Sequence, residues 1–350
     1  MKRAGTVGGL YFLVHFAVEV TSFYVLTCCT QNPFVWTLFL LYDFLAFVPQ
    51  GVFGRLRDRG IRLNFALTGT ALTSLSLILL FFGANAFLTV TVLAVGNCLV
   101  HVHGAEVTLR TSPGRISPSA VFVSGGSFGV ITGKLLGSGQ VAVWWILALN
   151  LLAVVPVLIA ERIKAPDGTE NLRQYNFSNQ KLGTGMVIAL ATFVVVVRAY
   201  MGYGIPTSWN KTVLQTIMLY CAMGVGKAMG GILVDIIGIR KTSIISTLGA
   251  LPFLLFGADV MSVSLIGIAV FSMTMAVTLA LIVSRLQDSP GVAFGFTTLG
   301  LFLGTAPVFF FQIKSFIANC IMITILSVLC FVILLVIGAK RTKTAKERSK

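Results

Sequence analysis

Runs of about twenty apolar residues recur along the whole chain, and few charged residues interrupt them. Each run can cross the roughly 30 Å hydrocarbon core of a bilayer as a helix, which rises about 1.5 Å per residue. Charged residues make up only 11% of the 350 positions, whereas a soluble domain carries about 25%. The mean hydropathy is +0.93. The sequence therefore predicts an all-α integral membrane protein.

The apolar runs predict twelve transmembrane helices joined by short loops. Their expected ranges are 7–29, 33–52, 63–82, 85–106, 119–136, 141–160, 184–204, 212–234, 242–258, 261–283, 292–311 and 316–338. The longest connection contains the polar stretch "APDGTENLRQYNFSNQ". We therefore expect an N-terminal six-helix bundle over 1–160, a linker over 161–183, a C-terminal six-helix bundle over 184–338 and a basic tail over 339–350.

The placement of basic residues predicts the orientation of these helices, because short cytoplasmic loops are enriched in Lys and Arg. With both termini in the cytoplasm, 21 of the 26 basic residues lie on cytoplasmic segments. We expect a multi-pass protein of the cytoplasmic (plasma) membrane, whose tail "AKRTKTAKERSK" lies beside anionic lipid. The net charge of +15 then reflects topology and does not indicate nucleic-acid binding.

Motifs for chemistry on soluble substrates are missing from the sequence. It contains no Walker loop, no HExxH and no Ser-His-Asp constellation. Its six cysteines lack metal-ligand spacing and are interpreted as small apolar residues. We therefore expect no enzymatic activity, no cofactor, no metal site and a monomeric state.

Two pairs of similar segments indicate an internal repeat. "GRLRDRGIR" at 54–62 is echoed by "GILVDIIGIRK" at 231–241, and "SPSAVFVSGGSFGVITG" is echoed by "SPGVAFGFTTLGLFLG". The members of each pair occupy the same place in the two halves. Two facing bundles with a site between them near the midplane are a common transporter design.

The first pair of segments resembles the signature loop of the major facilitator superfamily. The full pattern Gly-x-Leu-x-Asp-x-x-Gly-x-Arg-Lys occurs at Gly231, Leu233, Asp235, Gly238, Arg240 and Lys241. A copy that is one residue shorter occurs at Gly54, Leu56, Asp58, Gly60 and Arg62. The resemblance covers the whole chain and implies the fold of that superfamily.

Charges in and near these loops predict a latch between the halves. A carboxylate can bind the positive N-terminus of a helix in the other half and pair with an arginine. The predicted latch residues are Asp58, Arg62, Arg110, Asp235, Arg240, Lys241 and Arg285. Arg110 is the expected partner of Asp58, and Arg285 that of Asp235. Alternatively, these charges only orient the topology.

Four segments of the first half resemble the fosmidomycin-resistance type of drug/proton antiporter. They are "HFAVE", "QGVFG", "GNCLVH" and "GGSFGVITGKLLG". The chain departs from that pattern at Gly51 and at Val102–His103, and Lys134 stands where antiporters of the superfamily usually have a proline. These departures concern substrate and direction of transport more than the fold.

Ionisable residues inside the spans are the candidate proton-coupling site, because such residues normally face a cavity or a partner. His15 and Glu19 lie one turn apart, and His101 is expected at a similar depth. We predict that Glu19, tuned by the two histidines, takes up and releases the coupling proton. Asp43 is a second carboxylate for this path or a packing residue. The alternative for the cluster is a neutral, hydrogen-bonded group that fixes helix packing.

Three cations within spans indicate the charge of the substrate. Arg198 has the fork geometry that suits a carboxylate or phosphonate. The predicted substrate site consists of Arg198, Lys227, Asn97 and Tyr24. The cation Lys134 is expected to extend to the membrane surface, whereas Arg198 could instead pair with an acid to close a gate.

These features favour a proton-coupled secondary transporter that exports a small anionic or zwitterionic molecule. The expected partners are this substrate, protons and membrane lipid. A proton symporter that imports a metabolite would use nearly all the same residues. A non-transporting sensor on a transporter fold is a third alternative, and it would need neither latch nor proton site.

Overall fold

The computed structural model describes residues 2–164, 175–313 and 315–339. This part of the chain forms twelve helical segments. The first six are α1 (Lys2–Cys28), α2 (Val35–Phe47) with α3 (Gln50–Asp58), α4 (Phe65–Phe81), α5 (Ala86–Thr111), α6 (Ser117–Ser138), and α7 (Val143–Leu152) with α8 (Val154–Ile163). The other six are α9 (Thr184–Gly204), α10 (Val213–Ile237), α11 (Ile239–Ile244) through η1 (Ile245–Gly249) to α12 (Leu251–Phe256), α13 (Met261–Ser272) with α14 (Thr274–Val283), α15 (Pro290–Thr305) with η2 (Ala306–Phe309), and α16 (Phe316–Ile337). Eleven segments are long and apolar enough to span a membrane, and α4 is slightly shorter.

Prolines explain most of the breaks within spans. Proline has no backbone N–H and its ring clashes with the carbonyl four residues earlier, so it interrupts an α-helix. Pro49 lies between α2 and α3, and Pro156 follows the break between α7 and α8. Pro252 follows the π-helical turn η1, and Pro307 lies in the 3₁₀ turn η2. The break between α13 and α14 at Met273 has no proline.

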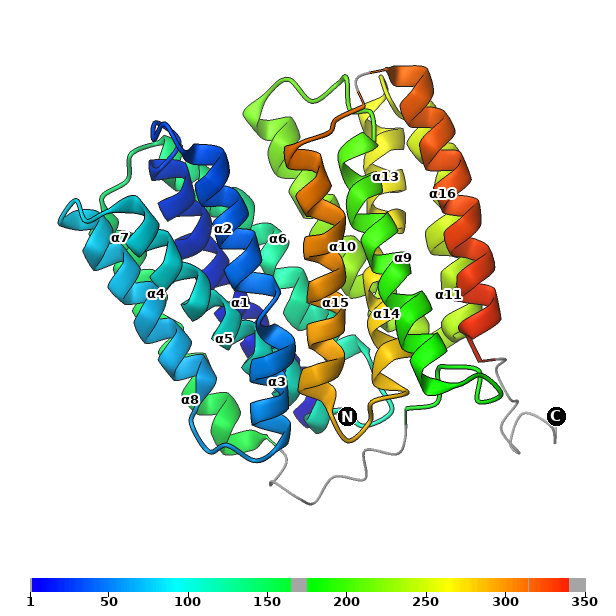
Figure 1. Ribbon diagram of the computed structural model, residues 1–350, viewed down its shortest axis with the longest axis horizontal. Helices are drawn as coiled ribbons and strands as arrows, with labels where there is room; N and C mark the ends of the chain where they lie inside the picture. The colour runs from blue at the N-terminus through cyan, green and yellow to red at the C-terminus, as the bar shows by residue number, and fades with distance from the viewer. Residues whose placement is uncertain (1, 165–174, 314, 340–350) are drawn as a thin grey trace.

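The helices form two bundles, α1 to α8 and α9 to α16 (Figure 1). The bundles approach one another at the end where α1 begins and α16 ends, and their ribbons lean apart at the other end (Figure 1). We call the first end the termini side. The linker residues 165–174, Lys314 and the tail residues 340–350 lie outside the described residues, so the predictions for them are not addressed.

Glycines allow close helix packing within each half. A Cβ on Gly125 or Gly129 of α6 would overlap the backbone carbonyl of Phe12 or Phe16 in α1. A Cβ on Gly304 of α15 would likewise overlap the backbone of Val196 in α9. These glycine stripes are therefore close packing surfaces between helices of the same half.

Between the halves, two close glycine contacts lie on the termini side. A Cβ on Gly291, at the start of α15, would lie 2.8 Å from the Cα of Gly54 in α3. A Cβ on Gly231 of α10 would overlap the Cβ of Ala120 in α6. Two similarly placed helix pairs, α3 with α15 and α10 with α6, thus bring the halves into backbone contact.

Candidate functional site

A cavity of ≈ 240 Å³ lies between the two bundles. Its polar lining comes from both halves. His15, Glu19, Asp43 and His101 lie on the N-terminal half, and Tyr203, Tyr220 and Lys227 lie on the C-terminal half. A second cavity of ≈ 490 Å³ shares Tyr203, Tyr220 and Lys227 with the first and adds Arg198. Acids therefore line one side of this central space and cations the other.

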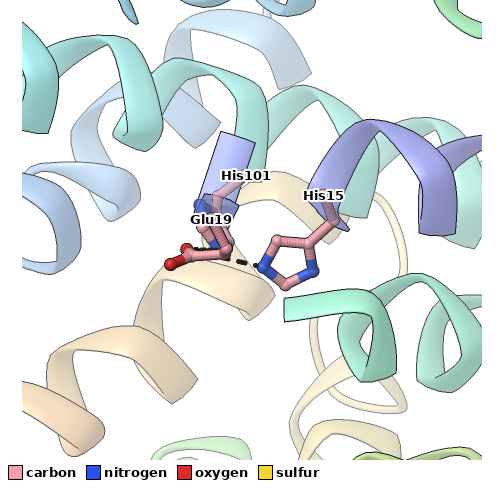
Figure 2. A group of neighbouring side chains, drawn as sticks. All are labelled: His15, Glu19 and His101. Atoms are coloured by element: carbon pink, nitrogen blue, oxygen red, sulfur yellow. Dashed lines mark ion pairs between the residues drawn. The ribbon is translucent and has the colours of Figure 1, made fainter. Parts of the chain in front are cut away.

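His15, Glu19 and His101 converge at the first cavity (Figure 2). Glu19 Oε1 lies 3.7 Å from His15 Nε2 and 3.5 Å from His101 Nε2. All three side chains are buried. His15 and Glu19 are one turn apart on α1, and His101 comes from α5. The structure thus brings together the three residues that the sequence grouped by depth.

Hydrogen bonds hold each member of this cluster in place. His15 Nδ1 donates to the carbonyl of Phe122 at 3.0 Å, and His101 Nδ1 donates to the carbonyl of Asn97 at 3.0 Å. The Asn97 side-chain amide donates to Glu19 Oε1 at 2.9 Å. It also contacts the hydroxyls of Ser22 and Tyr42. Asn97, predicted to bind substrate, is instead buried behind the cluster and positions Glu19.

Three charged side chains of the central space have no partner in the described part of the chain. Asp43 and Lys227 make no hydrogen bond or ion pair with any described residue. Arg198 has a buried Nε without an acceptor there. Burying a charge without a partner is unfavourable. These groups are therefore available to a ligand of complementary charge.

Tyr24 was predicted to belong to the substrate site, and the structure places it elsewhere. Its ring is buried, and its hydroxyl donates to the carbonyl of Val141 at 2.7 Å, in the loop after α6. It lines neither cavity. Its position facing α6 rather than the other half makes it a packing residue.

On the termini side, each signature-loop carboxylate binds a helix N-terminus of the other half. Asp58 accepts hydrogen bonds from the amides of Gly291 and Val292 at 3.1 and 2.9 Å, at the start of α15. Asp235 accepts from the amides of Ile116 and Ser117 at 2.9 and 3.1 Å, at the start of α6. A carboxylate at this position interacts favourably with free N–H groups and the helix dipole.

The arginine partners of these carboxylates agree with the prediction in one case only. Arg110 lies 3.2 Å from Asp58 Oδ1, as predicted. Arg285 does not pair with Asp235. It bonds to the backbone carbonyl of Asn179 and to the side chain of Gln180. Arg115 approaches Asp235 instead, at 3.6 Å, because it precedes the helix end that Asp235 binds.

The remaining predicted latch residues do not contact the carboxylates. Arg240 Nε donates to the carbonyl of Gly338 at 3.1 Å. Arg62 and Lys241 are exposed and form no ion pair within the described residues. The sequence analysis placed these three residues in the latch. In the structure they lie near the latch and take no part in its contacts.

An ion-pair network surrounds the Asp58 contact. Glu106 pairs with Arg57 at 2.8 Å and with Arg110 at 3.0 Å. His103 Nε2 lies 2.9 Å from Glu161, which also pairs with Lys164. Glu106 and Arg110 are four residues apart, a spacing that allows them to pair within one helix. No sequence signal distinguishes Arg57, because four arginines lie close together there and the sequence does not show which one turns inward.

Tyr175 of the linker joins the two halves on the termini side. Its hydroxyl donates to the carbonyls of Leu109 and Ser112 at 2.7 and 3.0 Å, at the end of α5. Gln287, between α14 and α15, bonds to its backbone. Sequence analysis missed this residue because a tyrosine in a polar linker carries no motif. Burial raises the pKa of the Tyr175 hydroxyl above its usual value.

Comparison with solved structures supports the fold, whereas the sequence comparisons found no match. No protein-family model and no curated protein matches the sequence. Among solved structures, the E. coli fucose:proton symporter FucP superposes with a TM-score of 0.69 at 14% identity, over 96% of this chain and 97% of that one. The human organic anion transporter MFSD10 gives 0.67 at 14% identity, over 95% and 99%. A double-tryptophan variant of XylE gives 0.65 at 15% identity, over 97% and 96%.

The chain is therefore a multi-pass membrane protein with the major facilitator superfamily fold, as the sequence predicted. Identities this low establish the fold alone. They do not confirm the resemblance to the fosmidomycin-resistance subgroup.

Proposed function

We propose that this protein is a proton-coupled secondary transporter, which moves a small anionic or zwitterionic molecule across the cytoplasmic membrane by alternating access. The central observation is the charged cavity between two halves that are clasped on the termini side. In transporters built from two repeats, the binding site lies at their interface, and the halves rock around it.

The latch formed by Asp58 and Asp235 is the contact that must break and re-form during alternating access. Opening the termini side requires the carboxylates of Asp58 and Asp235 to leave the N-termini of α15 and α6. The basic loops support a cytoplasmic location for that side. In this proposal the structure is the conformer closed to the cytoplasm, and the substrate reaches the cavity from outside or leaves toward it.

The cations of the C-terminal half support an anionic group on the substrate. Arg198 and Lys227 both line the larger cavity, and no acidic residue of the described chain lines it. A guanidinium offers two parallel donors to a carboxylate or phosphonate. The similarity to a protein described as an organic anion transporter points the same way.

The acids of the N-terminal half support proton coupling. Asp43 lines the smaller cavity without a partner in the described chain, so it can exchange a proton with the cavity. Glu19 was the sequence-based candidate and lies on the same wall. A carboxylate that must be neutral in one half of the cycle links proton movement to rocking.

We propose export as the direction, on the resemblance of the first half to drug/proton antiporters. Import is the competing direction, because a similar solved structure is a proton symporter. The two share one architecture and differ in whether proton and substrate move oppositely or together.

Proteoliposomes with an internal pH-sensitive dye test the proposal. A panel of phosphonates and small carboxylates is added outside, with and without an imposed pH gradient. We expect at least one compound to move protons in wild-type vesicles and not in Asp43→Asn vesicles. Asp259→Asn, which neutralises an exposed acid outside the cavity, is the matched control and should behave as wild type.

The sign of the proton movement decides the direction. Protons leaving the vesicle as the anion enters indicate antiport, and protons entering with it indicate symport. Proton movement that persists in Asp43→Asn would show that Asp43 is not the proton-coupling residue. No protein-dependent movement with any compound overturns the transport proposal.

A further inference from the structure

We propose that His15, Glu19 and His101 form a binding site for a divalent transition-metal ion such as Zn²⁺. The sequence analysis predicted no metal site, because the six cysteines lack metal-ligand spacing. The structure brings the third ligand, His101, from another helix. Two imidazoles and one carboxylate are a common ligand set for zinc.

The hydrogen bonds of the two histidines aim the ligand atoms at one point. A backbone carbonyl can only accept, so the Nδ1 atoms that face Phe122 and Asn97 carry the hydrogens. In the neutral rings, each Nε2 then presents a lone pair, and both Nε2 atoms face Glu19 Oε1 (Figure 2). Three electron-rich atoms that face one another repel unless a proton or a metal ion lies between them.

The spacing of these atoms fits a metal better than a hydrogen bond. The two nitrogen–oxygen distances, 3.7 and 3.5 Å, exceed the roughly 2.7–3.2 Å of a direct hydrogen bond. Zinc binds nitrogen and oxygen at about 2.0–2.1 Å, and the edges of such a tetrahedron measure about 3.4 Å. All three ligand atoms lie within 4.8 Å of one another. Shifts of a few tenths of an ångström would bring both nitrogen–oxygen distances to this edge length.

The surroundings have the features of a supported metal site. Ligating histidines usually donate their other ring nitrogen to a carbonyl or carboxylate, and ligating carboxylates are usually hydrogen-bonded in turn. Here the carbonyls of Phe122 and Asn97 and the amide of Asn97 fill these roles. With two neutral rings and one carboxylate, the site carries a net charge of −1.

A fourth coordination position would face the cavity that all three ligands line. Water or an anionic group of a bound molecule could occupy it, as in zinc sites that keep an open position. The inference stands on the ligand geometry and does not depend on transport. A metal on Glu19 would leave Asp43 as the cavity carboxylate free for a proton.

Zinc binding to the purified full-length protein tests the site. The protein is isolated in detergent through a tag without histidine and titrated with ZnCl₂ in a calorimeter, and bound zinc is counted after gel filtration. We expect one ion per chain. His101→Gln and Glu19→Gln should each weaken binding by at least about tenfold, since even residues behind the ligands change metal affinity by roughly 10- to 100-fold.

His103→Gln is the matched control, because it removes the third histidine of the chain, which bonds to Glu161 and not to the cluster. It should bind zinc as wild type does. X-ray absorption of the wild-type zinc complex provides a readout that needs no variant, and it should show two imidazoles and no sulfur. Sulfur ligands, unchanged affinity in His101→Gln, equal loss in His103→Gln, or no zinc bound to the wild type would each overturn the site.

Discussion

Asp58 Oδ2 accepts a hydrogen bond of 2.9 Å from the backbone amide of Val292, which joins the end of α3 to the start of α15. The two residues belong to different halves of the protein. The Gly54–Gly291 approach lies directly beside this bond. The charge contact and the backbone contact therefore close the termini side together, and each can be changed separately.

Neutralising Asp58 should favour opening of the termini side. Hydrogen bonds to a charged group contribute about 1.5–3 kcal/mol. Because Asp58→Asn keeps one acceptor, we expect the closed conformer to lose about 1.5 kcal/mol of stability. That shifts the ratio of open to closed conformers roughly tenfold. Spin-label distances across the termini side measure this ratio. Asp288→Asn, an exposed acid on the same side, should leave the distances unchanged, and an identical shift in both variants would contradict the latch.

A methyl group on Gly54 should also prevent closure. The added Cβ would overlap the backbone of Gly291, which cannot rotate away as a side chain could. Gly51→Ala is the matched control on the same helix, because a Cβ there meets nothing within 4 Å. Gly→Ala in a helix normally stabilises by up to about 1 kcal/mol. We expect Gly51→Ala to be neutral or stabilising in a thermal-shift assay, and Gly54→Ala to increase alkylation of a cysteine placed in the cavity from the termini side.

Removing the Arg198 charge should stabilise the protein while weakening anion binding. Its buried Nε has no acceptor in the described chain, and a buried donor without a partner costs about 1–3 kcal/mol, which an apolar side chain at this position would remove. Arg198→Met should therefore raise the melting temperature in detergent. Arg57→Met is the contrast, because it breaks the buried pair with Glu106, and it should lower the melting temperature. A lower melting temperature for Arg198→Met would show that Arg198 has a structural partner.

Tyr175→Phe should destabilise the termini side in a pH-dependent way. The hydroxyl donates to two carbonyls, and the net loss should be about 1–2 kcal/mol. The raised pKa of Tyr175 means that the folded state favours the protonated form. Its contribution is therefore complete below the unfolded pKa of about 10 and declines as the pH rises above that value. Denaturation of both proteins from pH 7 to 11 checks this expectation, and a constant difference across the range would contradict it.

Features that depend on a short stretch of chain were predictable from the sequence. The twelve spans follow from apolar runs, and their observed ends differ by only a few residues in most cases. Asp58 is the last residue of α3 and Asp235 lies in the last turn of α10, because a glycine-containing loop ends each helix. The shared depth of His15, Glu19 and His101 follows from counting residues along two helices of opposite direction.

Features that depend on which helix faces which were less predictable. Arg285 and Arg110 occupy equivalent places in the repeat, yet only Arg110 reaches its carboxylate. Tyr24 and Asn97 lie on helices that border the cavity, but neither faces it. The halves have diverged in their loops, so the repeat identifies corresponding positions without fixing their contacts.

The sequence alone determined the number of spans, the position of each polar group along its helix and the repeat that relates the halves. Only the tertiary structure decided the rotation of each helix, and with it the convergence of His15 Nε2, His101 Nε2 and Glu19 Oε1. The physical reason is that lipid and helix interfaces are both apolar, so the sequence of a transmembrane helix contains little information about which face is buried. Packing supplies that information, through the glycines that let α6 approach α1 and the carbonyls that orient the two imidazoles.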